Sequence, residues 1–166
     1  MHTERLILRP FTLEDAEEYF PLVSHPDVLR FTGEAPVNSL DEVRQILLTR
    51  PISDYAKYGF GRLACIDKTS GRLIGFSGLK YLPDLNEVDI GYRFLPNYWG
   101  KGYATESAKA IMDHMIPAHN LKRIIGLAYP ENAGSINVLI KLGLSFEKKI
   151  KLDGMQEDLD FYSITV

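Results

Sequence analysis

The architecture of this chain depends on one segment, Asp89-Ile-Gly-Tyr-Arg-Phe-Leu-Pro-Asn-Tyr-Trp-Gly-Lys-Gly-Tyr-Ala-Thr-Glu106. Apolar side chains alternate over residues 88–94, which is typical of a β-strand, and Pro96 ends that strand. A loop with two glycines follows at residues 99–104. From Thr105 the apolar residues recur at helical spacing, so the segment predicts a strand, a glycine loop and a helix in succession.

This succession is suited to binding an anion. The first turn of a helix has N–H groups without an intrahelical partner and a partial positive charge. Gly100 and Gly102 let the main chain approach a phosphate closely, where a Cβ would obstruct it. The main-chain amides from Gly100 to Thr105 are therefore predicted to bind phosphate. Lys101 either adds a positive charge there or is only solvated.

The spacing differs from that of the common nucleotide loops. A Walker loop needs a longer glycine span closed by Lys-Ser or Lys-Thr, and a dinucleotide fingerprint needs a third glycine near the start of its domain. The loop Trp99-Gly-Lys-Gly-Tyr-Ala104 instead resembles the pyrophosphate motif Gln/Arg-x-x-Gly-x-Gly/Ala of the GNAT superfamily of N-acetyltransferases, with Trp99 in place of Gln or Arg. Its flanking residues resemble the branch that includes the ribosomal-protein N-terminal acetyltransferases.

Composition indicates an ordinary globular protein, most simply one domain over residues 1–166. The net charge of −3 without a basic run argues against a nucleic-acid ligand. A single cysteine excludes an internal disulfide and suits the cytoplasm, where we expect the protein. No stretch is long and apolar enough for a membrane span, and no signal peptide is expected. The four histidines lack ligand spacing, so we expect no metal.

Periodicity and turn signals predict the element order βααβββαβαββ. Because hairpins precede a crossover helix, the fold is expected to be α/β (α+β), with a mixed, mostly antiparallel central sheet of about seven strands flanked by about four helices. Residues 51–58 are expected to be loop. The same order belongs to the GNAT superfamily, which also shares the pieces Arg5-Leu-x-Leu-Arg-Pro10, Asn132-x-x-Ser135 and Leu142-Gly143. The expected elements are strands at 3–9, 60–66, 72–80, 88–94, 123–128, 146–151 and 159–166, with helices at 15–23, 39–49, from 105 to near 117, and 135–142.

The resemblance implies acetyl-CoA as cosubstrate. It assigns the pyrophosphate to the loop and the acyl-pantetheine arm to the edge of the preceding strand, which we expect to part from residues 123–128. Asn132 is expected to contact the arm, although its sequence position also suits a helix N-cap. The residues so implied in binding acetyl-CoA are Tyr92, Arg93, Phe94, Gly100, Lys101, Gly102, Tyr103, Ala104, Thr105, Asn132 and Ser135.

Acetyl transfer to an amine needs a base, because an alkyl amine with a pKa near ~10 is protonated at neutral pH. Asp89 and Glu87 are the candidates, two residues apart on one face of the strand. Either acid is alternatively a structural partner of Arg93 or of a nearby lysine. A tyrosine that protonates the leaving thiolate in many members is Leu139 here. A glutamate base that some relatives carry is Leu127.

We therefore expect an acetyl-CoA-dependent N-acyltransferase that acts directly on a primary amine, as a monomer or homodimer. The acceptor is a small molecule or a peptide: a protein N-terminus, an amino acid, a polyamine or another small amine. Its site is expected between the two early helices and the loops 51–58 and 81–86, with Tyr58 and Tyr81 as candidate lining residues. Cys65 is expected to be a core residue, not a nucleophile. The alternatives are a non-catalytic acyl-CoA-binding or regulatory domain and a nucleotide-binding domain.

Overall fold

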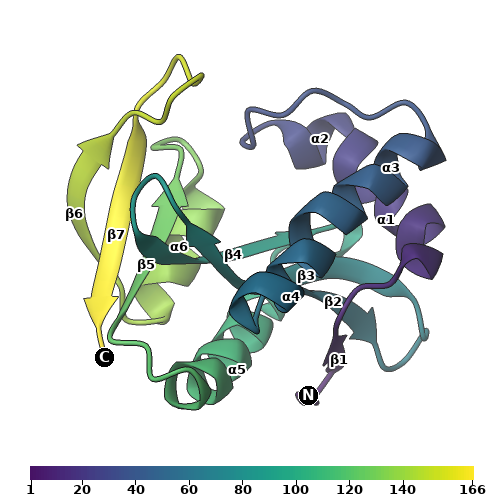
Figure 1. Ribbon diagram of the computed structural model, residues 1–166, viewed down its shortest axis with the longest axis horizontal. Helices are drawn as coiled ribbons and strands as arrows, with labels where there is room; N and C mark the ends of the chain where they lie inside the picture. The colour runs from purple at the N-terminus through teal and green to yellow at the C-terminus, as the bar shows by residue number, and fades with distance from the viewer.

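A mixed sheet of seven strands runs through the computed structural model, which describes residues 1–166 (Figure 1). The strand order is β1-β2-β3-β4-β5-β7-β6. All neighbouring strands are antiparallel except β4 and β5, which are parallel. The mixed, mostly antiparallel sheet predicted from the sequence is thereby confirmed. The strands are β1 Leu6–Arg9, β2 Arg62–Asp67, β3 Leu73–Leu82, β4 Glu87–Phe94, β5 Arg123–Ala128, β6 Ser145–Ile150 and β7 Leu159–Thr165.

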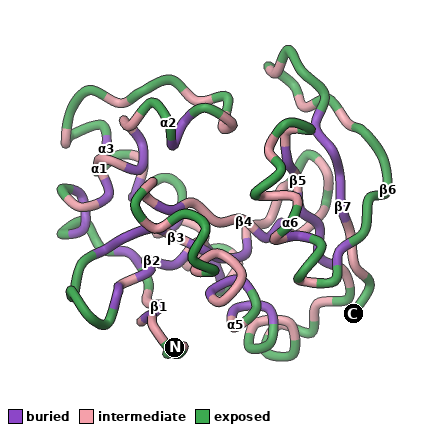
Figure 2. Tube along the Cα trace, turned by 180° about the vertical axis from the view of Figure 1, so that it is seen from behind, coloured by how far each residue is buried: buried purple, intermediate pink, exposed green.

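Helices cover both faces of this sheet, and each face has its own apolar core. On one face α5 and α6 pack against the strands through side chains such as Ile111 and Leu139. On the other face α1 and α3 do so, with Leu22 and Val43 fully buried. Figure 2 shows the buried segments following the inner strands, while edge strand β6 is exposed. The helices are α1 Ala16–Ser24, α2 Pro26–Leu29, α3 Leu40–Leu47, α4 Ser53–Tyr58, α5 Tyr103–Ala118 and α6 Ala133–Lys141.

The prediction of a loop over residues 51–58 is wrong, because α3 continues through a π-helical turn, Leu48–Ile52, into α4. Pro51 lies inside that turn. A proline has no N–H to donate, and the wider π turn accommodates it without ending the helical path. The short helix α2 was not predicted either. It begins with Pro26, and the His25 side chain caps it by accepting from the Asp27 N–H at 3.2 Å.

Strands β4 and β5 diverge almost at once, which is the feature that creates the site. Their only paired residues are Asp89 and Ile125. Beyond Asp89 the edge of β4 has no neighbouring strand on that side, and in Figure 1 the sheet opens between β4 and β5, with α5 beneath. The predicted parting of these two strands is therefore confirmed.

Candidate active site

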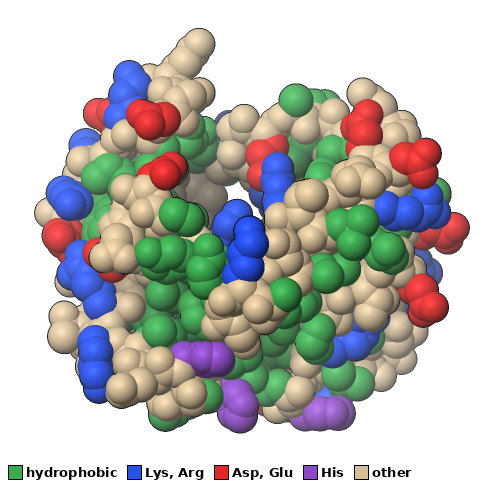
Figure 3. Space-filling model, viewed as in Figure 1, with side chains coloured by type: hydrophobic (Ala, Val, Ile, Leu, Met, Phe, Trp, Pro, Cys, Tyr) green, Lys and Arg blue, Asp and Glu red, His purple; other side chains and the backbone are tan.

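A cleft of about 1090 Å³ occupies the opening between the two halves of the sheet. Figure 3 shows this face of the molecule hollowed there, with Lys and Arg side chains at the hollow. Glu87 and Lys101 lie outside the lining. The predicted site residues that do line the cleft are Asp89, Tyr92, Arg93, Phe94, Gly100, Gly102, Tyr103, Ala104, Thr105, Asn132 and Ser135.

The glycine loop presents its main-chain N–H groups without partners. None of the amides of residues 100–105 donates a hydrogen bond within the chain, and the first amide that does is Glu106 N, to Gly102 O at 3.0 Å. Gly100 and Gly102 have φ angles of +70° and +84°, a conformation that L side chains rarely adopt. Six consecutive free donors at a helix N-terminus are suited to binding an anion such as a pyrophosphate.

The N-terminal segment braces this loop, a role that the sequence did not reveal. The Arg5 guanidinium donates to Lys101 O at 2.8 Å and to Glu106 Oε2 at 2.7 Å, and it lies over the Tyr103 ring. Glu106 Oε1 accepts from Thr3 Oγ1 and from Arg5 N. Burial alone would raise the pKa of Glu106, but these hydrogen bonds outweigh it and hold the pKa below its usual value.

The open edge of β4 presents main-chain groups to the cleft. Leu95 N donates to Ile74 O on β3 at 3.0 Å, and the pairing with β3 continues without a register shift. Because alternate residues of a strand bond to opposite sides, the N–H groups of Tyr92 and Phe94 point away from β3, toward the opening. The Arg93 main chain bonds to β3, so this residue contributes its side chain to the cleft.

Trp99, which departs from the motif, is tied to the same edge. Its indole Nε1–H donates to Phe94 O at 2.7 Å, and its ring remains about half exposed and lines the cleft. The indole N–H thus donates to a carbonyl that, in a continuous sheet, would accept from the N–H of a neighbouring strand. The loop and the strand edge are thereby held together at this point.

Asn132 caps α6, as its sequence position suggested. Its side-chain oxygen accepts from Ser135 N at 3.2 Å. Ser135 O in turn accepts from the Tyr92 hydroxyl at 2.7 Å, a bond that joins β4 to α6 across the opening. Burial raises the pKa of Tyr92, so its hydroxyl stays protonated and donates.

Asp89 faces the cleft and is paired with Arg62 of β2, a partner that the sequence did not suggest. Arg62 Nη2 lies 2.5 Å from Asp89 Oδ2, and Nη1 donates to Asp89 O at 3.1 Å. Burial raises the pKa of Asp89, and the charge of Arg62 opposes that rise. The guanidinium reaches Asp89 across Gly91, where a Cβ would overlap it.

Glu87 lies at the far end of β4 and is bound to Arg123, whose Nε is 2.9 Å from its Oε1. Arg123 also pairs with Glu147 at 2.7 Å. The two candidate bases therefore occupy different surroundings. Asp89 borders the cleft, whereas Glu87 belongs to an ion-pair network at the start of β5.

The end of the cleft where the acceptor is expected is lined mainly by α2, the segment before α3, and the turn from α3 into α4. Residues 81–86 and Tyr58 lie outside the lining of this cleft, and the Tyr81 ring packs against Tyr58. The charged side chains at this end that sequence reasoning missed are Asp27, Arg30, Glu34, Arg50, Asp54, Arg62 and Lys80.

The chain matches the model of the GNAT acetyltransferase domain over residues 5–145. It belongs to the GNAT family. It is 33% identical over 151 residues to an uncharacterised N-acetyltransferase, p20, of Bacillus licheniformis, covering 90% of this chain and 83% of that protein. It is 29% identical to the spermidine N(1)-acetyltransferase of Escherichia coli K12, covering 86% and 74%. A crystal structure of a GNAT acetyltransferase from Bacillus anthracis superposes with a TM-score of 0.82 at 27% identity, covering 99% of this chain and 97% of that one.

The family and these relatives make the chain an acetyl-CoA-dependent acetyltransferase. The narrower resemblance to the ribosomal-protein branch stays a prediction. This chain has leucine at the two positions where many GNAT members carry a proton-donating tyrosine and some carry a glutamate base. Leu139, at the tyrosine position, is buried against Gly126, and Leu127, at the glutamate position, lines the cleft. Cys65 is fully buried, and burial raises the pKa of its thiol, as suits a core residue.

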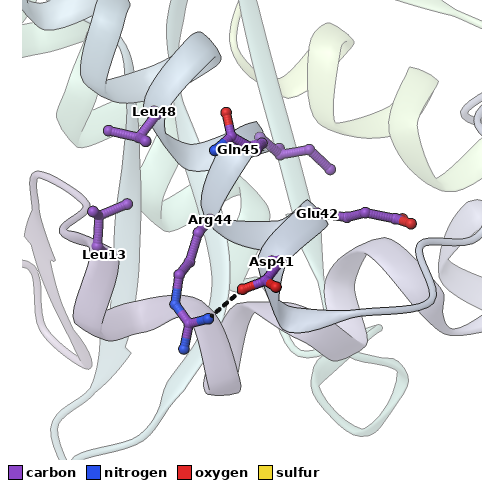
Figure 4. A pocket seen from close by; sticks show the side chains of 7 residues that line it. Leu13, Asp41, Glu42, Arg44, Gln45 and Leu48 are labelled. Carbon is purple, nitrogen blue, oxygen red and sulfur yellow. Dashed lines mark hydrogen bonds and ion pairs between the residues drawn. The ribbon is translucent and has the colours of Figure 1, made fainter.

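A second depression lies on the outer face of α3, away from these groups (Figure 4). Most of its side chains are exposed, and the one interaction among them is the ion pair of Arg44 with Asp41 at 3.0 Å. It brings together no set of groups suited to catalysis. None of the helices has the length and apolar character needed to cross a membrane.

Proposed function

We propose that this GNAT enzyme transfers the acetyl group of acetyl-CoA directly to a primary amine. The observation that carries the proposal is the row of free amides at residues 100–105, which borders the same cleft as the open edge of β4 and Asp89. These groups fit the two ends of the cosubstrate: the amides suit a pyrophosphate, and the strand edge suits an amide-bearing thioester arm.

The strand edge has a second role in this proposal. The N–H groups of Tyr92 and Phe94 face the position of the thioester carbonyl and stabilise the negative charge that develops on its oxygen. A preorganised donor of this kind lowers a barrier by about 3 kcal/mol. The bond from Tyr92 to Ser135 fixes the width of the opening in which the arm lies.

Asp89 is our proposed base, acting on the amine through a water molecule. It borders the cleft, where burial raises the pKa of its carboxyl and the charge of Arg62 opposes that rise. Glu87 is the second candidate for the base, although its side chain does not line the cleft. The side chain of Leu139 has no proton to donate, so CoA leaves as its thiolate without a general acid from this position, since an alkyl thiol such as that of cysteine has a pKa of about 8.5.

The transfer is proposed to need no acyl-enzyme intermediate. Cys65 is the only thiol of the chain, and it is buried outside the cleft. Initial rates are measured while the concentrations of acetyl-CoA and the amine are both varied. The double-reciprocal plots should therefore show intersecting lines, whereas parallel lines would indicate a covalent intermediate.

The decisive experiment is a thermal-shift measurement with CoA, acetyl-CoA, ATP and NAD, followed by thiol release from acetyl-CoA with a panel of amines. We expect stabilisation by CoA and acetyl-CoA alone, turnover with at least one amine, and a loss of turnover in Asp89→Asn that exceeds the loss in Glu87→Gln. Binding of CoA with no turnover would support a non-catalytic acyl-CoA-binding domain. Stabilisation by ATP or NAD without CoA would support a nucleotide-binding domain.

A further inference from the structure

The buried and half-buried charged side chains at the acceptor end of the cleft are equal in number for each sign, but they are not all paired. Three basic side chains there are half-buried, and three acidic side chains are half-buried or buried. Charges held in such a position are costly unless each has a partner or meets a ligand. The six residues are Arg62, Lys80, Arg93, Glu34, Asp54 and Asp89.

Two of the acids are already bound by arginines. Asp89 is held by Arg62 at 2.5 Å. Glu34 is held by Arg93 from the sheet and by Arg50 from the turn before α4, each at 3.2 Å. One carboxylate therefore serves two guanidinium groups at this second position, which leaves a positive charge there that is not neutralised.

The remaining two side chains, Lys80 and Asp54, make no hydrogen bond or ion pair within the chain, yet both line the cleft. Burial lowers the pKa of Lys80 and raises the pKa of Asp54, so each pays for desolvation without a bonded partner. The two opposite charges act on each other without a direct bond, so the cleft holds one group of each sign that has no hydrogen-bonded partner.

Lys80 also lies close to the place of reaction. On β3 it is paired in register with Asp89 of β4, and residues paired in this way have Cα atoms about 5.5 Å apart with side chains on the same face. Arg62 reaches Asp89 on that face too. A group bound by the Lys80 ammonium would therefore lie within a small molecule's length of the amine that Asp89 serves.

We infer that the acceptor is a primary amine that also carries an anionic group, with Lys80 binding that group and Asp54 facing the ammonium. This inference rests on the proposed function. A polyamine fits these residues poorly, because its additional ammonium groups would meet Lys80 and the arginines with only one free carboxylate available. Carboxylate and phosphate are the two anionic groups that a lysine binds in this way.

The test measures kcat/KM for thiol release from acetyl-CoA with amines offered as matched pairs. Phenylalanine, glutamine and β-alanine are each compared with their carboxamides, phosphoethanolamine is compared with ethanolamine, and spermidine is included. We expect the best acceptor to exceed its neutral counterpart by about tenfold or more, the usual effect of a charge-assisted hydrogen bond. The favoured pair identifies carboxylate or phosphate as the anion.

Variants then assign the effect to Lys80. Lys80→Met should bring the ratio of kcat/KM for the anionic amine to kcat/KM for its neutral counterpart toward one. Lys80→Arg should retain most of the preference for the anionic amine. Lys122→Met, an equal charge change at an exposed lysine just before β5, should leave the ratio unchanged. Preference for a neutral amine or for spermidine, or a ratio that Lys80→Met does not alter, would overturn the inference.

Failure of the proposed function gives a different result. If CoA binds but no amine is acetylated, direct transfer is refuted. Calorimetry then measures the binding of each anionic amine and its neutral counterpart to the CoA-loaded protein, which tests whether Lys80 binds an anionic group. Tighter binding of the anionic member, lost in Lys80→Met and retained in Lys122→Met, would support it. Equal binding of both members would refute it.

Discussion

Arg62 Nη2 lies 2.5 Å from Asp89 Oδ2, although strand β3 separates the two residues in the sheet. The arginine crosses β3 at Gly78 and passes over Gly91, where a Cβ would overlap its guanidinium. This contact acts on the titration of Asp89, because burial raises the pKa of the carboxyl and Arg62 opposes that rise.

Replacing Arg62 should therefore impair both folding and catalysis. In Arg62→Met the carboxylate of Asp89 stays buried without its partner, which should cost about 3 to 5 kcal/mol in the free energy of unfolding. The pKa of Asp89 should rise further, so the acid limb of the pH profile of kcat/KM should move to higher pH. Urea unfolding and a pH series of thiol-release rates measure the two effects.

A double variant separates these effects. Arg62→Met with Asp89→Asn removes the stranded charge and should recover part of the lost stability without recovering activity. An unchanged pH profile in Arg62→Met would argue against Asp89 as the base that this profile reports.

The glycine loop allows a prediction with a closely matched control. Gly100 and Gly71 share a φ of +70°, and at both positions a Cβ would meet no atom within 4 Å. Alanine at either position should therefore cost a similar backbone strain, about 1 kcal/mol. Only Gly100→Ala places a methyl group where the amides meet the pyrophosphate, so only this variant should raise the KM for acetyl-CoA, by about tenfold. Equal KM values in the two variants would contradict the assignment of the loop.

Trp99 should matter through its indole N–H. Trp99→Phe removes the 2.7 Å bond to Phe94 O and should raise the KM for acetyl-CoA a few-fold, because the loop is released from the strand edge. Tyr81→Phe removes a hydrogen bond of similar length outside the cleft, the exposed 2.8 Å bond from the hydroxyl to Asn86 Oδ1. Its KM should equal that of the wild type, and a similar rise in both variants would indicate a general loss of stability.

The cosubstrate half of the site was predictable because its signals are local. The alternation over residues 88–94, the two glycines and the helical spacing after them lie within one stretch of chain. The acceptor half was not predictable, because it depends on sheet register. Arg62 meets Asp89 from 27 residues away, and an arginine at the start of an apolar strand gives no sign of that contact. The loop predicted over residues 51–58 is helical instead, and nothing in the sequence indicates that a π turn accommodates Pro51.

The hydrogen bonds from Thr3 and Arg5 to Glu106 of α5 should make a contribution to the free energy of unfolding that is lost at acid pH. Glu106 accepts hydrogen bonds from Thr3 and Arg5, which hold its pKa below the unfolded value of about 4.5. Because the folded-state pKa is lowered, this contribution is complete above the unfolded value and is lost as the pH falls through the folded value. Glu106→Gln should therefore lower the free energy of unfolding by about 1 to 3 kcal/mol at pH 7.

The difference between wild type and Glu106→Gln should shrink as the pH falls from 6 toward 3, which urea titrations at several pH values measure. Asp113→Asn is the matched control on the same helix, since Asp113 is exposed and pairs only with Lys109 at 2.9 Å. An exposed pair of this kind contributes at most about 1 kcal/mol, so this variant should differ little from the wild type at any pH. A Glu106→Gln deficit that stays constant down to pH 3 would show that the lost stability comes from packing and not from the ionised carboxylate.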